Sequence, residues 1–360
     1  MNIIRQSYCR DRTRDLIFLI ILLILFPLSL KSSAQNFNCA VEGKVFSDST
    51  RQPLENVNVY ISGTTWGTTT DKSGHFKIDR LPYGVHNVVA SIIGYKPEIA
   101  EVTLTGNSIV ELKFYLKEIT YELSQVEVTG KAPEYWKENI KEFEKNFLGD
   151  DDFAADCKIL NPEVLNFTRS DKRVITVEAS KPLIIINNDL GYKILCNLTG
   201  FFWNEKTVET KFGVETYYTE LYDSTDELKK EWIKNRRKAY KGSLIHFIRS
   251  LINNTLFSEG YTIYINSSPD ISEYNYLVSR DRIIKVNDDG IITLNFDGYL
   301  RVEHKYNFFS TNGKVSWLKL NQPGVLINKN GYTENPFAFN IYGYWAKKRL
   351  ADMLPKYYYP

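Results

Sequence analysis

Histidine offers the widest choice of chemistry near neutral pH, and this 360-residue chain contains only four histidines. They are His75, His86, His246 and His304. Zinc peptidases need paired ligands such as His-x-x-Glu or His-Glu-x-x-His, and none of the four begins either pattern. His75 and His86 lie in runs with strand patterning, where we expect structural roles. We therefore predict no metal site and no cofactor.

Other catalytic motifs are also missing from the sequence. Gly-x-Ser-x-Gly, the P-loop and Gly-x-Gly-x-x-Gly do not occur. Ser316 and Lys319 fit Ser-x-x-Lys, but they lie in a strand-like run without companion motifs, so we discount them. Paired glycosidase carboxylates come from distant positions and leave no local spacing, which keeps a hydrolase open. The sequence favours a protein without catalytic residues.

A basic stretch near the middle of the chain is a candidate anion or partner site. Its members are Arg236, Arg237, His246 and Arg249. Guanidinium groups bind carboxylate or phosphate in bidentate fashion, which would suit such a site. The same spacing also suits the polar face of an amphipathic helix, and the second reading is the simpler one.

Three consecutive aspartates, Asp150 to Asp152, could suggest calcium. They lack the alternating ligand spacing of an EF-hand loop, so we expect a solvated turn.

The first 34 residues have the pattern of a signal peptide. An arginine-bearing start precedes an apolar run, Leu16–Leu30, which is shorter than the roughly 20 residues of a transmembrane helix. Small residues at Ser32 and Ala34 predict cleavage before Gln35. An uncleaved N-terminal anchor is the alternative. We expect an exported protein with no transmembrane span after signal removal.

The net charge of the chain is +2, but residues 1–34 hold five basic and two acidic residues. The remaining chain carries about −1. Binding to nucleic acid would require a concentrated basic face, so we expect no nucleic-acid partner.

Cysteine chemistry does not organise this chain. Cys39, Cys157 and Cys196 remain after the leader, and no Cys-x-x-Cys spacing occurs. One bridge, for instance between Cys157 and Cys196, and buried free thiols are both open. Cys39 has no small residues before it, which argues against a lipoprotein.

Aromatic residues make up 14% of the chain, which favours β-structure because aromatic side chains prefer strands. The N-terminal region shows seven short strands separated by turn residues, as in a β-sandwich. Asp71 and Gly74 suit the first and last positions of a type I turn, and Pro82 begins a second turn. The predicted strands are Ala40–Phe46, Val57–Ser62, Gly67–Thr70, His75–Leu81, Val85–Ile93, Ile99–Thr105 and Ile109–Leu116.

This region resembles the carboxypeptidase regulatory-like domain family over about 80 residues. The matching segments are Val41–Val45, Gln52–Val59, Gly67–Asp71, Gly74–Phe76, Leu81–Gly84 and Ile93–Tyr95. The resemblance implies a non-catalytic, transthyretin-like β-sandwich in the cell envelope of Bacteroidetes bacteria. It implies structural roles for the family-motif positions, which are Gly43, Pro53, Asp71, Gly74, Phe76, Pro82, Gly84, Gly94 and Tyr95.

In that family the module accompanies metallocarboxypeptidases, begins TonB-dependent receptors, or occurs in stand-alone envelope proteins. The rest of this chain lacks zinc ligands for the first setting. It also lacks the several hundred residues of a 22-stranded barrel with its plug. Leu123–Gly130 resembles the stretch that follows the domain in such receptors.

The C-terminal region predicts an α+β domain. One helix is expected over Glu134–Phe147, and a second begins at Ser224 with a capping box to Glu227 and is split near Gly242. The predicted strands are Lys158–Phe167, Val174–Ala179, Leu183–Ile186, Tyr192–Trp203, Val208–Leu221, Tyr261–Ile265, Ile283–Val286, Ile291–Phe296, Leu300–Tyr306 and Lys314–Leu320.

We predict a mainly β protein with an α+β part: a signal peptide (1–34), a seven-stranded sandwich (38–118), a linker (119–133) and an α+β domain (134–360). The leading hypothesis is a non-enzymatic protein of the periplasm or outer-membrane envelope, whose sandwich docks partners or supports the second domain. Its expected partner is an envelope or outer-membrane protein, or a glycan. The alternative is a glycan-binding protein or hydrolase with its site in the aromatic-rich C-terminal region.

Overall fold

The computed structural model describes residues 39–119, 134–170, 173–222, 225–270, 276–287, 291–305, 314–333, 335 and 337–360. The predicted signal peptide with its cleavage site at Ala34 and Gln35, the linker from 120 onward, and Ser224 lie outside these residues. Residues 38–360 form one compact unit. Within the described part, no helix is long and apolar enough to cross a membrane.

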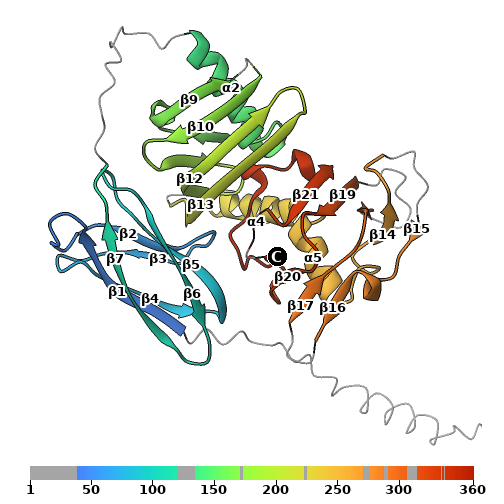
Figure 1. Ribbon diagram of the computed structural model, residues 1–360, viewed down its shortest axis with the longest axis horizontal. Helices are drawn as coiled ribbons and strands as arrows, with labels where there is room; N and C mark the ends of the chain where they lie inside the picture. The colour runs from blue at the N-terminus through green and yellow to red at the C-terminus, as the bar shows by residue number, and fades with distance from the viewer. Residues whose placement is uncertain are drawn as a thin grey trace, which may run out of the picture. The chain divides into compact units, whose positions relative to one another are not determined.

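The N-terminal sandwich contains the seven strands that the turn pattern predicted. One sheet has the order β4-β1-β7, and the other has the order β3-β2-β5-β6 (Figure 1). Alternating apolar side chains from both sheets form one buried cluster, as strand alternation requires. The strands are β1 (Cys39–Ser47), β2 (Asn58–Ile61), β3 (Gly67–Thr69), β4 (His75–Leu81), β5 (Gly84–Ser91), β6 (Glu98–Leu104) and β7 (Ile109–Leu116).

A close approach of two backbones holds the first sheet together. Strand β1 pairs in parallel with β7 from Ala40 opposite Ile109 to Ser47 opposite Leu116. A Cβ atom on Gly43 would lie only 1.9 Å from the carbonyl oxygen of Leu112. Glycine is therefore required at this position by backbone contact.

The predicted turn at Asp71 is present. The Oδ1 atom of Asp71 accepts hydrogen bonds from the backbone N–H groups of Ser73 and His75, at 2.8 and 2.9 Å. Gly74 has a φ of +73°, which a residue with a side chain rarely adopts. This turn joins β3 to β4.

The next part of the chain is a six-stranded sheet covered by aromatic side chains of α2. Its order is β8-β11-β12-β10-β9, with β13 paired to β12 as a long hairpin (Figure 1). Phe143 and Phe147 on α2 pack against Phe201 and Phe212. The elements are α2 (Glu134–Phe147), α3 (Asp152–Ala155), β8 (Cys157–Ile159), β9 (Leu165–Ser170), β10 (Val174–Ala179), β11 (Leu183–Asn187), β12 (Tyr192–Asn204) and β13 (Glu209–Glu220).

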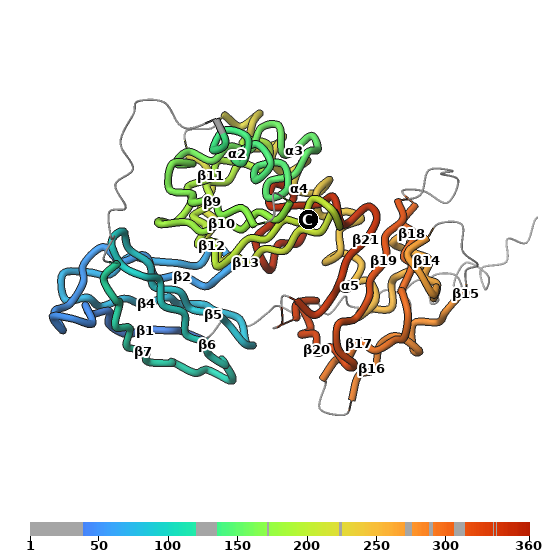
Figure 2. Tube along the Cα trace, turned by 45° about the horizontal axis from the view of Figure 1, so that its top comes forward, coloured from blue at the N-terminus to red at the C-terminus, as the bar shows by residue number. Residues whose placement is uncertain are grey.

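The last part has two helices and two sheets. Helix α5 buries Phe247, Ile248 and Leu251 in a cluster with residues of the β15-β14-β18-β19-β21 sheet and of the β16-β17-β20 sheet. Figure 2 shows the trace of these strands. The elements are α4 (Asp226–Tyr240), α5 (Leu244–Ile252), β14 (Tyr261–Asn266), β15 (Tyr276–Leu277), β16 (Ile284–Val286), β17 (Ile292–Leu294), β18 (Tyr299–His304), β19 (Lys314–Leu320), β20 (Val325–Ile327) and β21 (Phe339–Gly343).

The structure differs from the sequence prediction at several points. The expected strand Lys158–Phe167 is two strands, because Pro162 begins a short 3-10 helix between them. Helix α4 is capped by Thr225, whose hydroxyl accepts from the N–H of Leu228. The pattern also missed β15, β20 and β21. Residues 134–360 contain two hydrophobic clusters, and their assignment to one domain stays a prediction.

We predict that Gly43→Ala destabilises the protein by about 1–3 kcal/mol, because the new methyl group collides with a backbone oxygen that cannot rotate away. Urea denaturation followed by circular dichroism measures the change. Gly200→Ala is the matched control, since a Cβ at Gly200 meets no atom within 4 Å. Equal stabilities of the two variants would contradict the role given to the β1–β7 contact.

Candidate functional site

Helix α4 has one buried face, and Arg236 lies on it. Its Nε donates to the carbonyl oxygen of Leu190 at 2.8 Å, and Nη1 donates to Oε1 of Glu220 at 2.6 Å. The guanidinium carbon lies 4.0 Å from the ring centre of Tyr192. These contacts satisfy the buried charge and fasten α4 to the turn between β11 and β12.

Arg249 on α5 is also buried, with 3% of its surface exposed. Its Nε donates to the carbonyl oxygen of Asn330 at 3.0 Å, and Nη1 donates to that of Tyr358 at 2.6 Å. The guanidinium stacks 4.0 Å from the ring centre of Tyr359. Arg249 therefore holds residues 358–359 against the helix.

His246 is the centre of a buried polar network between α5 and β14. Its Nδ1 accepts from the backbone N–H of Gly242 at 3.0 Å and lies 2.8 Å from the hydroxyl of Tyr261. Its Nε2 lies 3.1 Å from Oε2 of Glu259 and donates to it, since a carboxylate only accepts. Burial lowers the pKa of His246, and Glu259 partly offsets this effect.

A second histidine completes the network. The ring of His304 packs 4.5 Å from that of Tyr261 and 6.1 Å from that of His246. Burial, with further contributions from His246 and Lys314, lowers the pKa of His304 to about 4. Both imidazoles are therefore neutral at pH 7.

Glu259, His246 and Tyr261 are linked like the carboxylate, imidazole and hydroxyl of a catalytic proton relay. The hydroxyl, however, is not accessible to a substrate. Tyr261 is 4% exposed, and burial raises the pKa of its hydroxyl well above the ordinary value. A nucleophile must reach a substrate and must lose its proton readily. The network is thus suited to holding α5 against β14 and β18.

The structure places the four residues of the predicted anion site differently. Arg236, His246 and Arg249 point into the protein and bond to described residues, while Arg237 lies on the exposed side of α4. The exposed position of Arg237 agrees with its interpretation as part of the polar face of an amphipathic helix. Binding of an anion or partner by the four residues stays a prediction, because no observation tests it.

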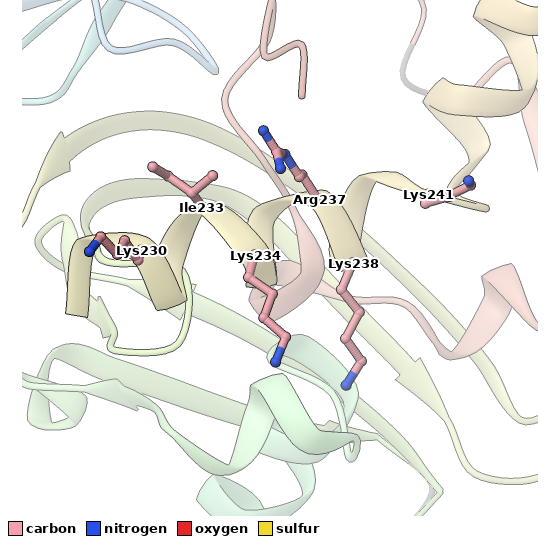
Figure 3. A pocket seen from close by; sticks show the side chains of 6 residues that line it. All are labelled: Lys230, Ile233, Lys234, Arg237, Lys238 and Lys241. Carbon is pink, nitrogen blue, oxygen red and sulfur yellow. The ribbon is translucent and has the colours of Figure 1, made fainter. Parts of the chain in front are cut away.

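The exposed side of α4 carries a basic face, of which sequence reasoning singled out only Arg237. Six side chains extend from the helix around a shallow, open hollow (Figure 3). In Figure 3, Lys234 and Lys238 extend to one side, and Ile233 and Arg237 extend to the other. The six residues, which we call the basic face of α4, are Lys230, Ile233, Lys234, Arg237, Lys238 and Lys241. Their 3–4 spacing was legible in the sequence.

The remaining sequence candidates have structural partners. Asp151 is half-buried, caps α3 and bonds to Lys348 at 2.5 Å, so it is not the solvated residue that we expected. Ser316 is buried and accepts from the N–H of Trp345, whereas Lys319 is exposed on the opposite face of β19. An odd separation on a strand prevents any nucleophile–base pair there.

Cys39, Cys157 and Cys196 are buried free thiols, and burial raises the pKa of Cys157 to about 12. Among the residues that the structure describes, no cluster of three His, Cys, Asp or Glu residues could hold a metal ion.

The N-terminal sandwich falls within a segment of the chain that matches a known domain family. Residues 41–128 match the model of the CarboxypepD_reg-like domain family. The N-terminal sandwich is a carboxypeptidase regulatory-like domain. In this domain Phe76 is buried, Pro53 forms a β-bridge with Phe46, and the Tyr95 hydroxyl donates to Glu118. The match leaves residues 129–360 unassigned.

A curated relative is similar to part of this chain. The TonB-dependent receptor SusC of Bacteroides thetaiotaomicron is 31% identical over 116 residues, which are 32% of this chain and 11% of SusC. The chain therefore matches only a small part of the receptor. The similarity is consistent with the Bacteroidetes envelope type that the sequence indicated.

Solved structures align only weakly. A cohesin–X-dockerin complex from Acetivibrio cellulolyticus is 28% identical, covers 21% of this chain and 52% of that chain, and has a TM-score of 0.19. A putative carbohydrate binding protein from Bacteroides uniformis is 7% identical, covers 81% of this chain and 99% of that chain, and also has a TM-score of 0.19. At these scores neither structure carries an inference about function.

We predict that acidification destabilises the protein through His304. An unfolded histidine takes up a proton near pH 6.5, whereas folded His304 takes one up only near pH 4, so this contribution is present above pH 6.5 and is lost towards pH 4. Its full size is about 3 kcal/mol.

The measurement is the urea midpoint between pH 7 and pH 4.5. His304→Gln should show a smaller loss across this range than wild type, because glutamine does not titrate. His75→Gln, at an exposed position, is the control and should follow wild type. Parallel pH profiles for wild type and His304→Gln would contradict the prediction.

Proposed function

We propose that the protein is a non-enzymatic envelope protein in which the regulatory-like sandwich supports, and presents to partners, the C-terminal region. The signal-peptide pattern supports export, and the similarity to part of SusC supports an envelope location. Regulatory-like domains are not catalytic, and the buried networks described above have structural partners. The observation that carries the proposal is the contact between the sandwich and β13.

The backbone just after β2 forms hydrogen bonds with β13, one strand of the β12–β13 hairpin. Gly63 donates its N–H to the carbonyl oxygen of Thr216 at 2.7 Å, and Tyr218 donates to that of Thr64 at 3.0 Å. Thr64 and Tyr217 thereby form a parallel β-bridge. Backbone pairing of this kind fixes position without demanding particular side chains.

Side chains reinforce the same contact. Tyr60 is fully buried, its ring stacks 5.2 Å from that of Tyr217, and its hydroxyl donates to the carbonyl oxygen of Glu215. The same hydroxyl accepts from the amide of Asn197. The sandwich therefore loses a buried hydrogen-bonded surface if it separates from the rest of the chain.

Residues near the end of the sequence join the contact from the other side. The N–H of Lys356 donates to the carbonyl oxygen of Gly63 at 2.6 Å. Tyr357 packs against Trp66 and His86 of the sandwich. Because Arg249 holds Tyr358, this segment connects the sandwich to α5.

We predict that Tyr60→Phe destabilises the protein by about 1–3 kcal/mol, since it removes a partner of the buried Asn197 amide. Differential scanning calorimetry tests whether the sandwich then melts separately. Tyr83→Phe is the control, because it removes a sandwich hydroxyl that bonds to no described residue. A wild-type profile for Tyr60→Phe would argue against a supporting contact.

The function itself is tested by cell fractionation and by affinity capture from envelope extract of the native host. The proposal expects the protein in the envelope fraction and a specific outer-membrane protein in the eluate. Recovery in the cytoplasm, or enrichment of glycan without protein, would contradict it.

A second candidate, glycan binding, rests on one row of side chains. Cross-strand pairing places Tyr264, Arg301, Trp317 and Tyr342 side by side on the face of the β14–β18–β19–β21 sheet opposite the buried cluster. Tyr342 contacts Tyr299 in an edge-to-face pair. The indole nitrogen of Trp317 is buried, and no described residue accepts its hydrogen bond. Arg301 and Trp317 are each 6% exposed and Tyr264 and Tyr342 are half-buried, so a sugar would meet this row mainly through the two tyrosine rings.

This candidate predicts that affinity electrophoresis in envelope polysaccharide retards the protein, and that Tyr342→Ala weakens the retardation at least several-fold. Tyr115→Ala, at an exposed position of the sandwich, is the control. Unchanged mobility of the wild-type protein in every polysaccharide would eliminate glycan binding at this row.

A further inference from the structure

The basic face of α4 concentrates positive charge on an otherwise balanced protein. Residues after the predicted leader carry a net charge of about −1, yet five of the six residues of this face are cationic. Lys238 pairs with Asp152 at 3.3 Å. No carboxylate of a described residue forms an ion pair with Lys230, Lys234 or Arg237, and all three are exposed. Their charge is available to an external anion.

The inward face of the same helix is fully used by the fold. Trp232, Arg236 and Tyr240 are buried, and Arg236 is fastened to Leu190 and Glu220. Rotation of α4 would expose Trp232 and Tyr240 and break the bonds of Arg236. Whatever binds the basic face meets flexible cationic side chains on a fixed helix and on Lys241 just after it, spread over about 16 Å at 1.5 Å per residue.

The residue types favour a diffuse anionic surface over a shaped protein pocket. Four of the five cations are lysines, which protein–protein interfaces disfavour and which bind as point charges without a fixed geometry. Ile233 lies among them and is 45% exposed, so an apolar side chain is presented with the charges. Lysines around an exposed apolar residue on a surface helix suit a lipid bilayer with anionic headgroups.

We propose that the basic face of α4 binds the anionic headgroups of a lipid bilayer. The lysines and Arg237 lie over the headgroup phosphates, and Ile233 enters the interface between headgroups and acyl chains. This attachment is peripheral and electrostatic, so salt weakens it. It is independent of the contact between the sandwich and β13, on which the proposed function rests.

The test is cosedimentation of residues 35–360, which include the compact unit 38–360, with two kinds of vesicle. Vesicles of equal parts phosphatidylglycerol and phosphatidylcholine should bind the protein, and vesicles of phosphatidylcholine alone should not. Each cation near an anionic surface contributes a factor of about five to binding. The triple variant Lys230→Glu/Lys234→Glu/Arg237→Glu should therefore bind at least about 100-fold more weakly.

The control is Lys72→Glu/Lys96→Glu/Lys113→Glu, which changes the net charge equally at exposed sandwich positions and should bind like wild type. Circular dichroism and the melting temperature establish that each variant folds. Equal binding of the two triple variants, salt-independent binding, or no binding of the wild-type protein to anionic vesicles would overturn the proposal. Capture of an acidic protein or polysaccharide through this face, without vesicle binding, would also overturn it. None of these results alters the outcome of fractionation or of the Tyr60→Phe experiment.

Discussion

A buried guanidinium needs hydrogen-bond acceptors, and this requirement positions helices α4 and α5. Arg236 finds a carbonyl oxygen before β12 and a carboxylate at the end of β13, while Arg249 finds carbonyl oxygens at residues 330 and 358. Removing either set of acceptors would leave a charge in an apolar setting, which costs several kcal/mol. The orientation of α4 and α5 follows from these bonds.

The orientation of α4 and α5 also determines how the last residues of the chain contact the N-terminal sandwich. Arg249 holds Tyr358, which brings Lys356 to Gly63 and Tyr357 to Trp66 in the sandwich. Thr64 of the sandwich pairs with Tyr217 of β13. Glu220, at the end of β13, accepts a hydrogen bond from Arg236. One network of buried hydrogen bonds thus links the regulatory-like domain to the region after it. This linkage is the physical basis for regarding the sandwich as a support.

The same orientation gives α4 two unlike faces. Its inward side supplies Trp232, Arg236 and Tyr240 to the fold, and its outward side leaves a row of cations facing solvent. On the outward side Lys238 pairs with Asp152, whereas Lys230, Lys234 and Arg237 make no ion pair with a described residue. A binding role at this face and a structural role at the other are therefore compatible within one helix.

The sequence alone determined the elements whose patterns are local. Strand alternation and turn residues predicted all seven sandwich strands, and a 3–4 apolar spacing predicted α2 with both ends correct. Family motifs identified the sandwich because its glycines and turns are set by backbone geometry, as Gly43 against Leu112 illustrates.

Only the tertiary structure decided which side of each element faces the core. Arg236 and Arg237 are neighbours in sequence, yet one is buried and the other exposed, because a helix turns each residue by about 100° and the covering strands come from distant segments. The division of residues 134–360 into two hydrophobic clusters also depends on long-range pairing, such as that of β19 with β21. The spacing of residues within one segment does not show which distant segments pack against it. The sequence alone therefore could not distinguish an anion site from a helix face in the basic stretch.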